Sequence, residues 1–140
     1  MLYEDVVGLA EDVDFELHRA PRHVAVLMEK AKVLGVFANR YAYHAEEIAL
    51  AFYRHRRRHA KRPRLFIARI SAENRMSRPC SHCCALLRSF PRLRVYYTDR
   101  GGTFLEETTF DASHISLRRR HLGMRPAGFA EQTRPQKISF

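Results

Sequence analysis

The sequence predicts an α/β fold in three layers (α/β/α), with helices on both faces of a mixed sheet of about five strands. Three observations predict it. Some segments carry apolar residues at helical spacing, short β-rich runs bounded by turn residues lie between them, and the two kinds of segment alternate along the chain. The 140 residues suffice for one hydrophobic core, so we expect a single domain over 1–140.

The first half of the chain is predicted to contain a helix, a β-hairpin and a second helix. Apolar residues recur at helical spacing over 2–19 and predict a helix, which Pro21 ends. Residues 23–28 and 33–38 are β-rich and flank the polar turn "EKAK", a pattern that is typical of a hairpin. Over 43–58 apolar residues again share one helical face.

The second half is predicted to contain a strand over 64–71, a helix and a closing pair of strands. Pro79 suits the first turn of a helix, which we expect to run to about Phe90. The segments "LRVYYTD" and "TFLEETTF" flank the tight turn "RGG" and predict an antiparallel hairpin. Further on the chain is basic and without periodicity, so a core over about 22–120 precedes a partly irregular tail over 121–140.

The composition and the charge pattern indicate where in the cell the protein acts and which kinds of partner it binds. A formal net charge of +10 favours polyanionic partners such as nucleic acid, nucleotides or an anionic membrane surface. No apolar run approaches the roughly 18 residues of a membrane span. The N-terminus is acidic and lacks the basic segment that begins a secretory signal. We therefore expect an intracellular protein of the cytoplasm or nucleus, with no membrane partner.

All three cysteines lie within five residues of one another, at Cys80, Cys83 and Cys84. Such an odd, clustered set is a poor disulfide framework and a good metal or redox site. Cys80 and Cys83 stand about one turn apart at the start of the predicted helix, where both sulfurs can face one point and the helix dipole favours thiolates. Cys84 points about 100° away from Cys83, so we expect it to pack, and His82 should face away from the metal.

The tripeptide "HAE", His44 to Glu46, is common by itself and fits a structural histidine beside a surface glutamate. The cysteines change this interpretation, because one imidazole and two thiolates leave a tetrahedral zinc ion one open position, as in catalytic sites. That position holds a water molecule whose pKa the metal lowers. Glu46 can reach the water without binding the metal and can move its proton. H-x-E followed by P-C-x-x-C is the signature of zinc nucleobase deaminases.

The chain resembles the cytidine deaminase superfamily in this pair of motifs and in the elements around them: a hairpin, a helix with "HAE", a strand, and a helix that opens with "PCSHC". Its "VYY" strand, glycine turn and later "SHIS" segment are similar to deaminase-like proteins of fungi and large DNA viruses. The resemblance covers about 22–120. It implies His44, Cys80 and Cys83 as zinc ligands and Glu46 as the proton shuttle in hydrolytic deamination of a cytosine base.

The resemblance also implies substrate contacts at four further residues. Asn39 precedes the "HAE" helix, where family members place an asparagine that hydrogen-bonds the sugar, although a turn asparagine explains it equally well. Phe37 either stacks on the base or, as we favour, is a buried strand residue. Ala45 would offer backbone groups to the base. Arg78 departs from the family pattern, because many relatives have Ser or Glu directly before Pro-Cys. How this rim of the pocket meets its substrate is therefore an open question, and the arginine favours a phosphate contact.

Two basic runs are candidates for nucleic-acid contact, one at the end of the "HAE" helix and one in the later part of the chain. A solvated face that complements the C-terminus of the helix explains the first run equally well. That end should lie about 15–20 Å from the zinc, so it could hold a nucleic-acid backbone only at a distance from the pocket. The candidate residues are Arg54, Arg57, Arg58, Arg62, Arg118, Arg119 and Arg120.

The substrate class stays open between several alternatives. A closing antiparallel hairpin resembles the free-nucleoside branch of the family, whereas polynucleotide editors more often insert a helix that makes these strands parallel. This slightly favours free cytidine, deoxycytidine or their nucleotides, while the charge of +10 favours single-stranded DNA or RNA. Deamination of adenine or guanine, and a catalytically silent protein that binds nucleic acid or another partner, are further alternatives. Relatives that act on free nucleosides are often homo-oligomers.

Overall fold

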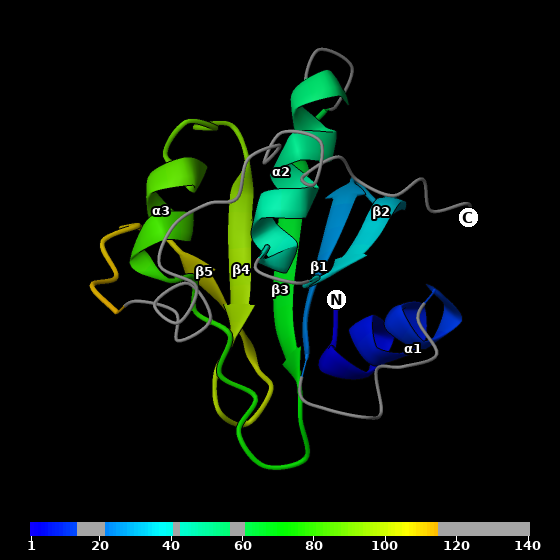
Figure 1. Cartoon of the computed structure of the whole chain (residues 1–140). Helices are drawn as coiled ribbons and strands as arrows, with labels where there is room; N and C mark the ends of the chain where they lie inside the picture. The colour runs from blue at the N-terminus through cyan, green and yellow to red at the C-terminus, as the bar shows by residue number, and fades with distance from the viewer. Residues whose placement is uncertain (14–21, 41–42, 57–60, 115–140) are drawn as a thin grey trace.

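The computed structural model describes residues 1–13, 22–40, 43–56 and 61–114 of the chain (Figure 1). Within these residues the predicted α/β class is confirmed by three helices and five strands, and no helix is long and apolar enough to cross a membrane. The elements are α1 (Tyr3–Val13), β1 (Arg22–Glu29), β2 (Lys32–Ala38), α2 (Ala45–Arg56), β3 (Pro63–Ile70), α3 (Ser81–Leu87), β4 (Arg94–Thr98) and β5 (Phe104–Glu107).

The five strands form one mixed sheet in the order β2-β1-β3-β4-β5. β1 is antiparallel to both β2 and β3, β3 is parallel to β4, and β4 is antiparallel to β5. A parallel pair requires a crossover connection, and the segment that contains α3 provides it between β3 and β4. The antiparallel pairing of β4 with β5, in which Tyr96 lies opposite Glu106, confirms the predicted closing hairpin.

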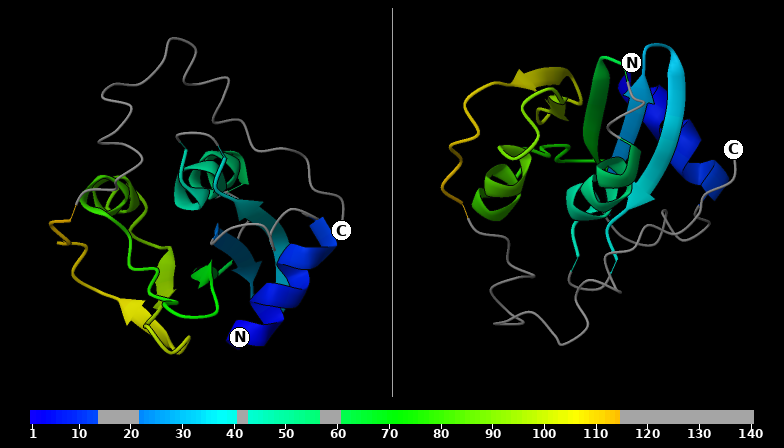
Figure 2. Two further views of the ribbon diagram at one scale, coloured as in Figure 1. Left: turned by 60° about the horizontal axis from the view of Figure 1, so that its bottom comes forward. Right: turned by 90° about the horizontal axis from the view of Figure 1, so that it is seen from above.

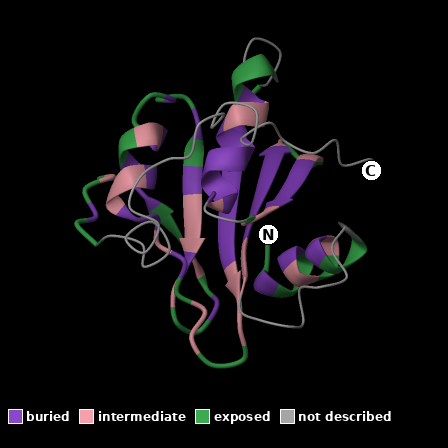
Figure 3. Cartoon of the chain, viewed as in Figure 1, coloured by how far each residue is buried: buried purple, intermediate pink, exposed green. Residues whose placement is uncertain are grey.

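Helices cover both faces of the sheet, with α1 on one face and α2 and α3 on the other (Figures 1 and 2). Successive strand residues point to opposite faces. Accordingly, Val24 and Val26 of β1 belong to the buried cluster under α1, whereas Ala25 and Leu27 belong to the cluster under α2. Figure 3 shows that buried residues concentrate in β1, β2 and β3, which makes the centre of the sheet the rigid support for the loops at its ends.

The bounds of the third helix differ from the prediction. The third helix begins at Ser81 and ends at Leu87, whereas a helix from Pro79 to about Phe90 was expected. Cys80 has an extended backbone with φ −70° and ψ 172° and is the N-cap, and its carbonyl accepts the first helical hydrogen bond from the Cys84 N–H at 2.8 Å. The described part of the first helix ends at Val13, and the remainder of its predicted range lies outside the described residues.

We expect Gly35→Ala to destabilise the protein, because a Cβ atom there would lie 2.5 Å from Cζ of Phe37. Phe37 is buried and packs on Phe52 with ring centroids 5.2 Å apart, so it has little room to move. Overpacking of this kind lowers the free energy of unfolding by about 1–3 kcal/mol.

The matched control is Gly8→Ala in α1, where an added Cβ meets nothing within 4 Å. This substitution should raise the free energy of unfolding by about 0.4–1 kcal/mol, since it restricts the unfolded chain. Urea denaturation of both variants measures the effects. Equal stabilities for the two variants would contradict the packing described around Phe37.

Candidate metal centre

The N-termini of two helices carry the predicted metal ligands. His44 immediately precedes α2 and accepts the Ile48 N–H through its carbonyl at 3.2 Å, so it is the N-cap of that helix. Cys80 is the N-cap of α3, and Cys83 lies in the first turn of the same helix. The fold brings these two helix starts together on one face of the sheet (Figure 1).

The three predicted ligand atoms form one cluster. Nδ1 of His44 lies 3.1 Å from Sγ of Cys83 and 3.6 Å from Sγ of Cys80, and all three atoms lie within 4.8 Å of one another. A tetrahedral zinc ion with bonds of about 2.0–2.3 Å separates its ligand atoms by roughly 3.5–4 Å. One imidazole nitrogen and two sulfurs at this spacing could therefore hold a metal ion such as zinc.

The charges of the three groups are strongly coupled. A hydrogen bond from the Cys83 thiol is the main factor that lowers the pKa of Cys80 to about 3. The same hydrogen bond, together with burial, raises the pKa of Cys83 well above its usual value. Burial lowers the pKa of His44, but its hydrogen bond to Cys80 and the nearby carboxylates outweigh burial and raise it overall. These opposite shifts favour the thiolate at Cys80 and the thiol at Cys83.

Glu46 lies beside the cluster, in the first turn of α2, and only 2% of it is exposed. Burial is the main factor that raises the pKa of its carboxyl group, and the charge of His44 opposes this rise. Among the described residues Oε1 of Glu46 has no hydrogen-bond partner. An unsatisfied buried polar atom costs about 1–3 kcal/mol, which is typical of a group whose partner is a bound ligand.

The loop that leads to Cys80 is anchored to the sheet through Ser77. Its hydroxyl donates to the Ile67 carbonyl at 2.7 Å and accepts the Thr98 N–H at 2.7 Å, while its N–H donates to the Thr98 carbonyl at 2.9 Å. Ser77 and Thr98 are buried. Because buried hydrogen bonds to two different strands fix this residue, the cysteines that follow it start from a defined position above β3 and β4.

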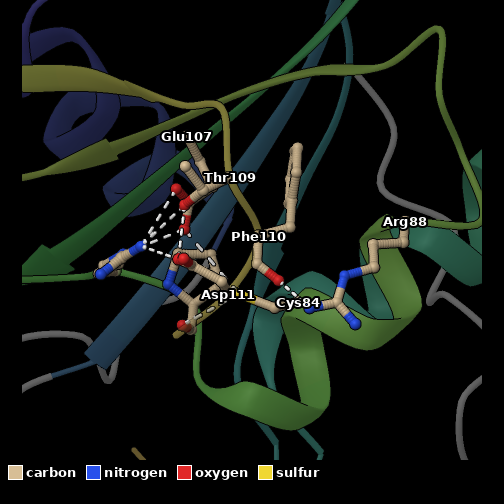
Figure 4. A network of polar contacts seen from close by, with 8 residues as sticks. Cys84, Arg88, Glu107, Thr109, Phe110 and Asp111 are labelled. Atoms are coloured by element: carbon tan, nitrogen blue, oxygen red, sulfur yellow. Dashed lines mark hydrogen bonds and ion pairs between the residues drawn. The ribbon is translucent and has the colours of Figure 1, made fainter. Parts of the chain in front are cut away.

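Arg78, a predicted substrate contact, takes part in an ionic network with Glu107, Thr109 and Asp111, which Figure 4 labels at the end of β5. Its guanidinium donates to Glu107 at 3.0 Å, Asp111 at 3.1 Å and Thr109 at 3.3 Å. Glu107 is buried, and this hydrogen bond is the main factor that raises the pKa of Arg78. The network ties the segment before Cys80 to the chain after β5, and a phosphate contact by Arg78 stays a prediction.

The other predicted substrate contacts lie at the start of α2 and at the end of β2. Asn39 accepts the His23 N–H through its side-chain oxygen at 3.1 Å and donates its own N–H to the His23 carbonyl at 3.1 Å. Phe37 is buried in the core under α2, and Ala45, the first residue of α2, is fully buried. Asn39 thus hydrogen-bonds the backbone of β1, and Phe37 and Ala45 belong to the core. Contacts of these residues with substrate stay predictions.

Two residues near the cluster have other partners. Cys84 is fully buried, and its thiol lies 3.5 Å from the Pro79 carbonyl. Nε2 of His82 lies 3.6 Å from Oε2 of Glu47. Sequence reasoning missed Glu47, whose Oε1 accepts the His44 N–H at 3.1 Å. A glutamate three residues after an N-cap is a helix-start signal, and it could have identified this contact.

The predicted nucleic-acid contacts fall only partly within the described residues. Arg54 is exposed near the C-terminal end of α2, and Arg62 is exposed just before β3 with a φ of 49°. The remaining candidates, Arg57, Arg58, Arg118, Arg119 and Arg120, lie outside the described residues.

None of three comparisons with known proteins produced a match. No family model matches the chain, and neither a curated protein nor a solved structure matches it significantly.

We predict one thiolate per chain in the metal-free protein at neutral pH. Cys80 should be ionised, because its pKa is about 3, and Cys83 should be protonated, because its pKa is raised. The ultraviolet absorbance of the thiolate should therefore disappear only as the pH falls towards about 3. Cys80→Ser should remove this absorbance, and Cys84→Ser, the control, should retain it. Thiolate absorbance that develops only near the ordinary thiol pKa of about 8.5 would contradict the coupling.

Proposed function

We propose that the protein is a zinc-dependent enzyme that hydrolytically deaminates a cytosine base, with free cytidine, deoxycytidine or their nucleotides as substrates. The observation that carries this proposal is the buried carboxyl of Glu46 beside the His44, Cys80 and Cys83 cluster. A structural zinc site gains nothing from a buried carboxylate with an unsatisfied oxygen. A site that must accept and return protons requires such a group.

The donor set supports zinc, and the neighbouring carboxyl supports hydrolysis. A zinc ion on one nitrogen and two sulfurs would supply a Lewis acid that lowers the pKa of a water molecule towards neutrality. Glu46 would accept one proton from that water and deliver it to the ring nitrogen of cytosine as a C4–O bond forms. It would then accept the second proton from the new hydroxyl group on C4 and pass it to the departing amine as the C4–N bond breaks, so cytosine and water give uracil and ammonia. Burial raises the pKa of Glu46, which favours a group that accepts and returns a proton between these steps.

The antiparallel arrangement of β4 and β5 supports a free nucleoside or nucleotide as substrate, because the chain resembles the free-nucleoside branch of the cytidine deaminase superfamily in this respect. The net charge of +10 supports a second candidate, single-stranded DNA or RNA, held by basic residues outside the pocket. Both candidates use the same zinc ligands and the same proton shuttle.

The test compares zinc-loaded wild-type protein with Glu46→Gln on cytidine, deoxycytidine, their monophosphates, adenosine, guanine and single-stranded DNA and RNA, with mass spectrometry to follow loss of the amino group. Wild type should deaminate a cytosine substrate. Glu46→Gln should lower the rate by about 10²–10⁴-fold, because the amide cannot transfer the proton. Its zinc content should equal that of wild type, because Glu46 is not a ligand.

The control variant is Glu73→Gln, which changes an exposed glutamate in the loop between β3 and α3 and should leave the rate unchanged. If Glu46→Gln retains the wild-type rate, the proposed role of Glu46 is wrong. If wild type binds zinc and deaminates nothing in this panel, the enzyme proposal is wrong, and a binding role on the same fold takes its place.

A further inference from the structure

We propose that Glu47 is a positioning residue that holds the two metal-binding helix starts at the spacing that the metal requires. The proposal rests on the metal centre of the proposed function, although not on the reaction. Glu47 neighbours Glu46 but faces different groups: the backbone N–H of His44 and the imidazole of His82. Its carboxylate thus joins α2 to α3 beside the cluster, without belonging to the cluster itself.

The first contact fixes the backbone of a metal ligand. Oε1 of Glu47 accepts the His44 N–H at 3.1 Å, while the His44 carbonyl accepts the Ile48 N–H at 3.2 Å. Both backbone groups of His44 are therefore held by residues of the first turn of α2. This constrains the direction of the Cα–Cβ bond, and with it the side on which Nδ1 approaches the sulfur atoms of Cys80 and Cys83.

The second contact reaches the helix that supplies the sulfurs. Nε2 of His82 lies 3.6 Å from Oε2 of Glu47, and His82 stands between Cys80 and Cys83 in α3. These two atoms lie within ion-pair distance but form no hydrogen bond, and the contact places the first turn of α3 beside the first turn of α2. Glu47 therefore lies at the contact between the two helices that supply the ligands.

The burial of Glu47 argues that it does more than cap a helix. Capping requires only one carboxylate oxygen at the helix start, and an exposed glutamate provides it. Glu47 is only 4% exposed and its side chain only 1% exposed. Burial of a carboxylate is unfavourable unless its oxygens have partners. Oε1 has the His44 N–H as its partner, whereas Oε2 forms no hydrogen bond with the described residues and has an ion-pair contact with His82. The position between the ligand His44 and the helix of the two cysteines accounts for this burial.

The test measures zinc affinity of the full chain by competition with a chelator, and the visible spectrum of the cobalt-substituted protein, which reports ligand geometry. Glu47→Ala should weaken zinc binding by about 10–100-fold, the usual effect of losing a group that orients a ligand, and should alter the cobalt spectrum. Glu47→Gln preserves the shape and an oxygen for the His44 N–H, so it should weaken zinc binding less. Glu73→Ala, the exposed control, should match wild type.

The contact with His82 is tested by combining variants. If Glu47 acts through His82, His82→Ala should weaken zinc binding, and the loss in the double variant should be smaller than the product of the two single losses. His82→Ala and Glu47→Gln also provide the test if Glu47→Ala does not fold. Wild-type zinc affinity and an unaltered cobalt spectrum in the Glu47 variants, even with a lowered melting temperature, would make Glu47 a helix cap alone and overturn the proposal.

These readouts are independent of deamination. A wild-type protein that binds zinc and deaminates nothing would overturn the proposed function and leave the role of Glu47 standing. A wild-type protein that binds neither zinc nor cobalt would overturn both.

Discussion

The meeting of two helix N-termini over one face of the sheet is the constraint on which the candidate site depends. One imidazole nitrogen from the start of α2 and two sulfurs from the start of α3 lie within 4.8 Å of one another. Neither helix start holds all three ligand atoms, because α2, β3 and the loop after β3 separate His44 from Cys80 in the sequence. The buried centre of the sheet lies under both helices, and the hydrogen bonds of Ser77 fix the loop that leads to α3.

Two neighbouring glutamates illustrate how one turn of a helix can supply different functions. Glu46 lies beside the cluster and keeps one carboxylate oxygen without a hydrogen-bond partner among the described residues. Oε1 of Glu47 accepts the His44 N–H, and its Oε2 forms no hydrogen bond within the described part of the chain but lies within ion-pair distance of His82. Both side chains are buried, so the difference comes from the groups that they face. In the proposed account, Glu46 transfers protons and Glu47 orients a ligand.

Much of this organisation could be predicted from local patterns. The alternation of helical and β-rich segments predicted the mixed sheet, and the spacing of Cys80 and Cys83 predicted that two sulfurs face one point. The start of α3 was predicted incorrectly, because Pro79 is compatible with a first helical turn, whereas Cys80 adopts an extended backbone. Local patterns do not contain the tertiary contacts that decide such a boundary.

For the same reason, local sequence patterns could not predict the partners of Arg78 and Glu47. Arg78 contacts Glu107, which is 29 residues away in the sequence, and only the pairing of β4 with β5 brings Glu107 to that position. The contact between Glu47 and His82 likewise depends on the packing of α2 against α3. The sequence shows which chemical groups are present, and the fold decides which of them meet.

The central claim is that the protein holds zinc in an open site beside a buried carboxyl group. The most direct test is a crystal structure of the zinc-loaded protein, with the metal located by anomalous scattering at the zinc edge. We expect zinc on Nδ1 of His44 and Sγ of Cys80 and Cys83, with a solvent molecule in the fourth position within hydrogen-bond distance of Glu46. A fourth position filled by a protein side chain such as Cys84, or a Glu46 carboxyl turned away from the metal, would contradict the claim.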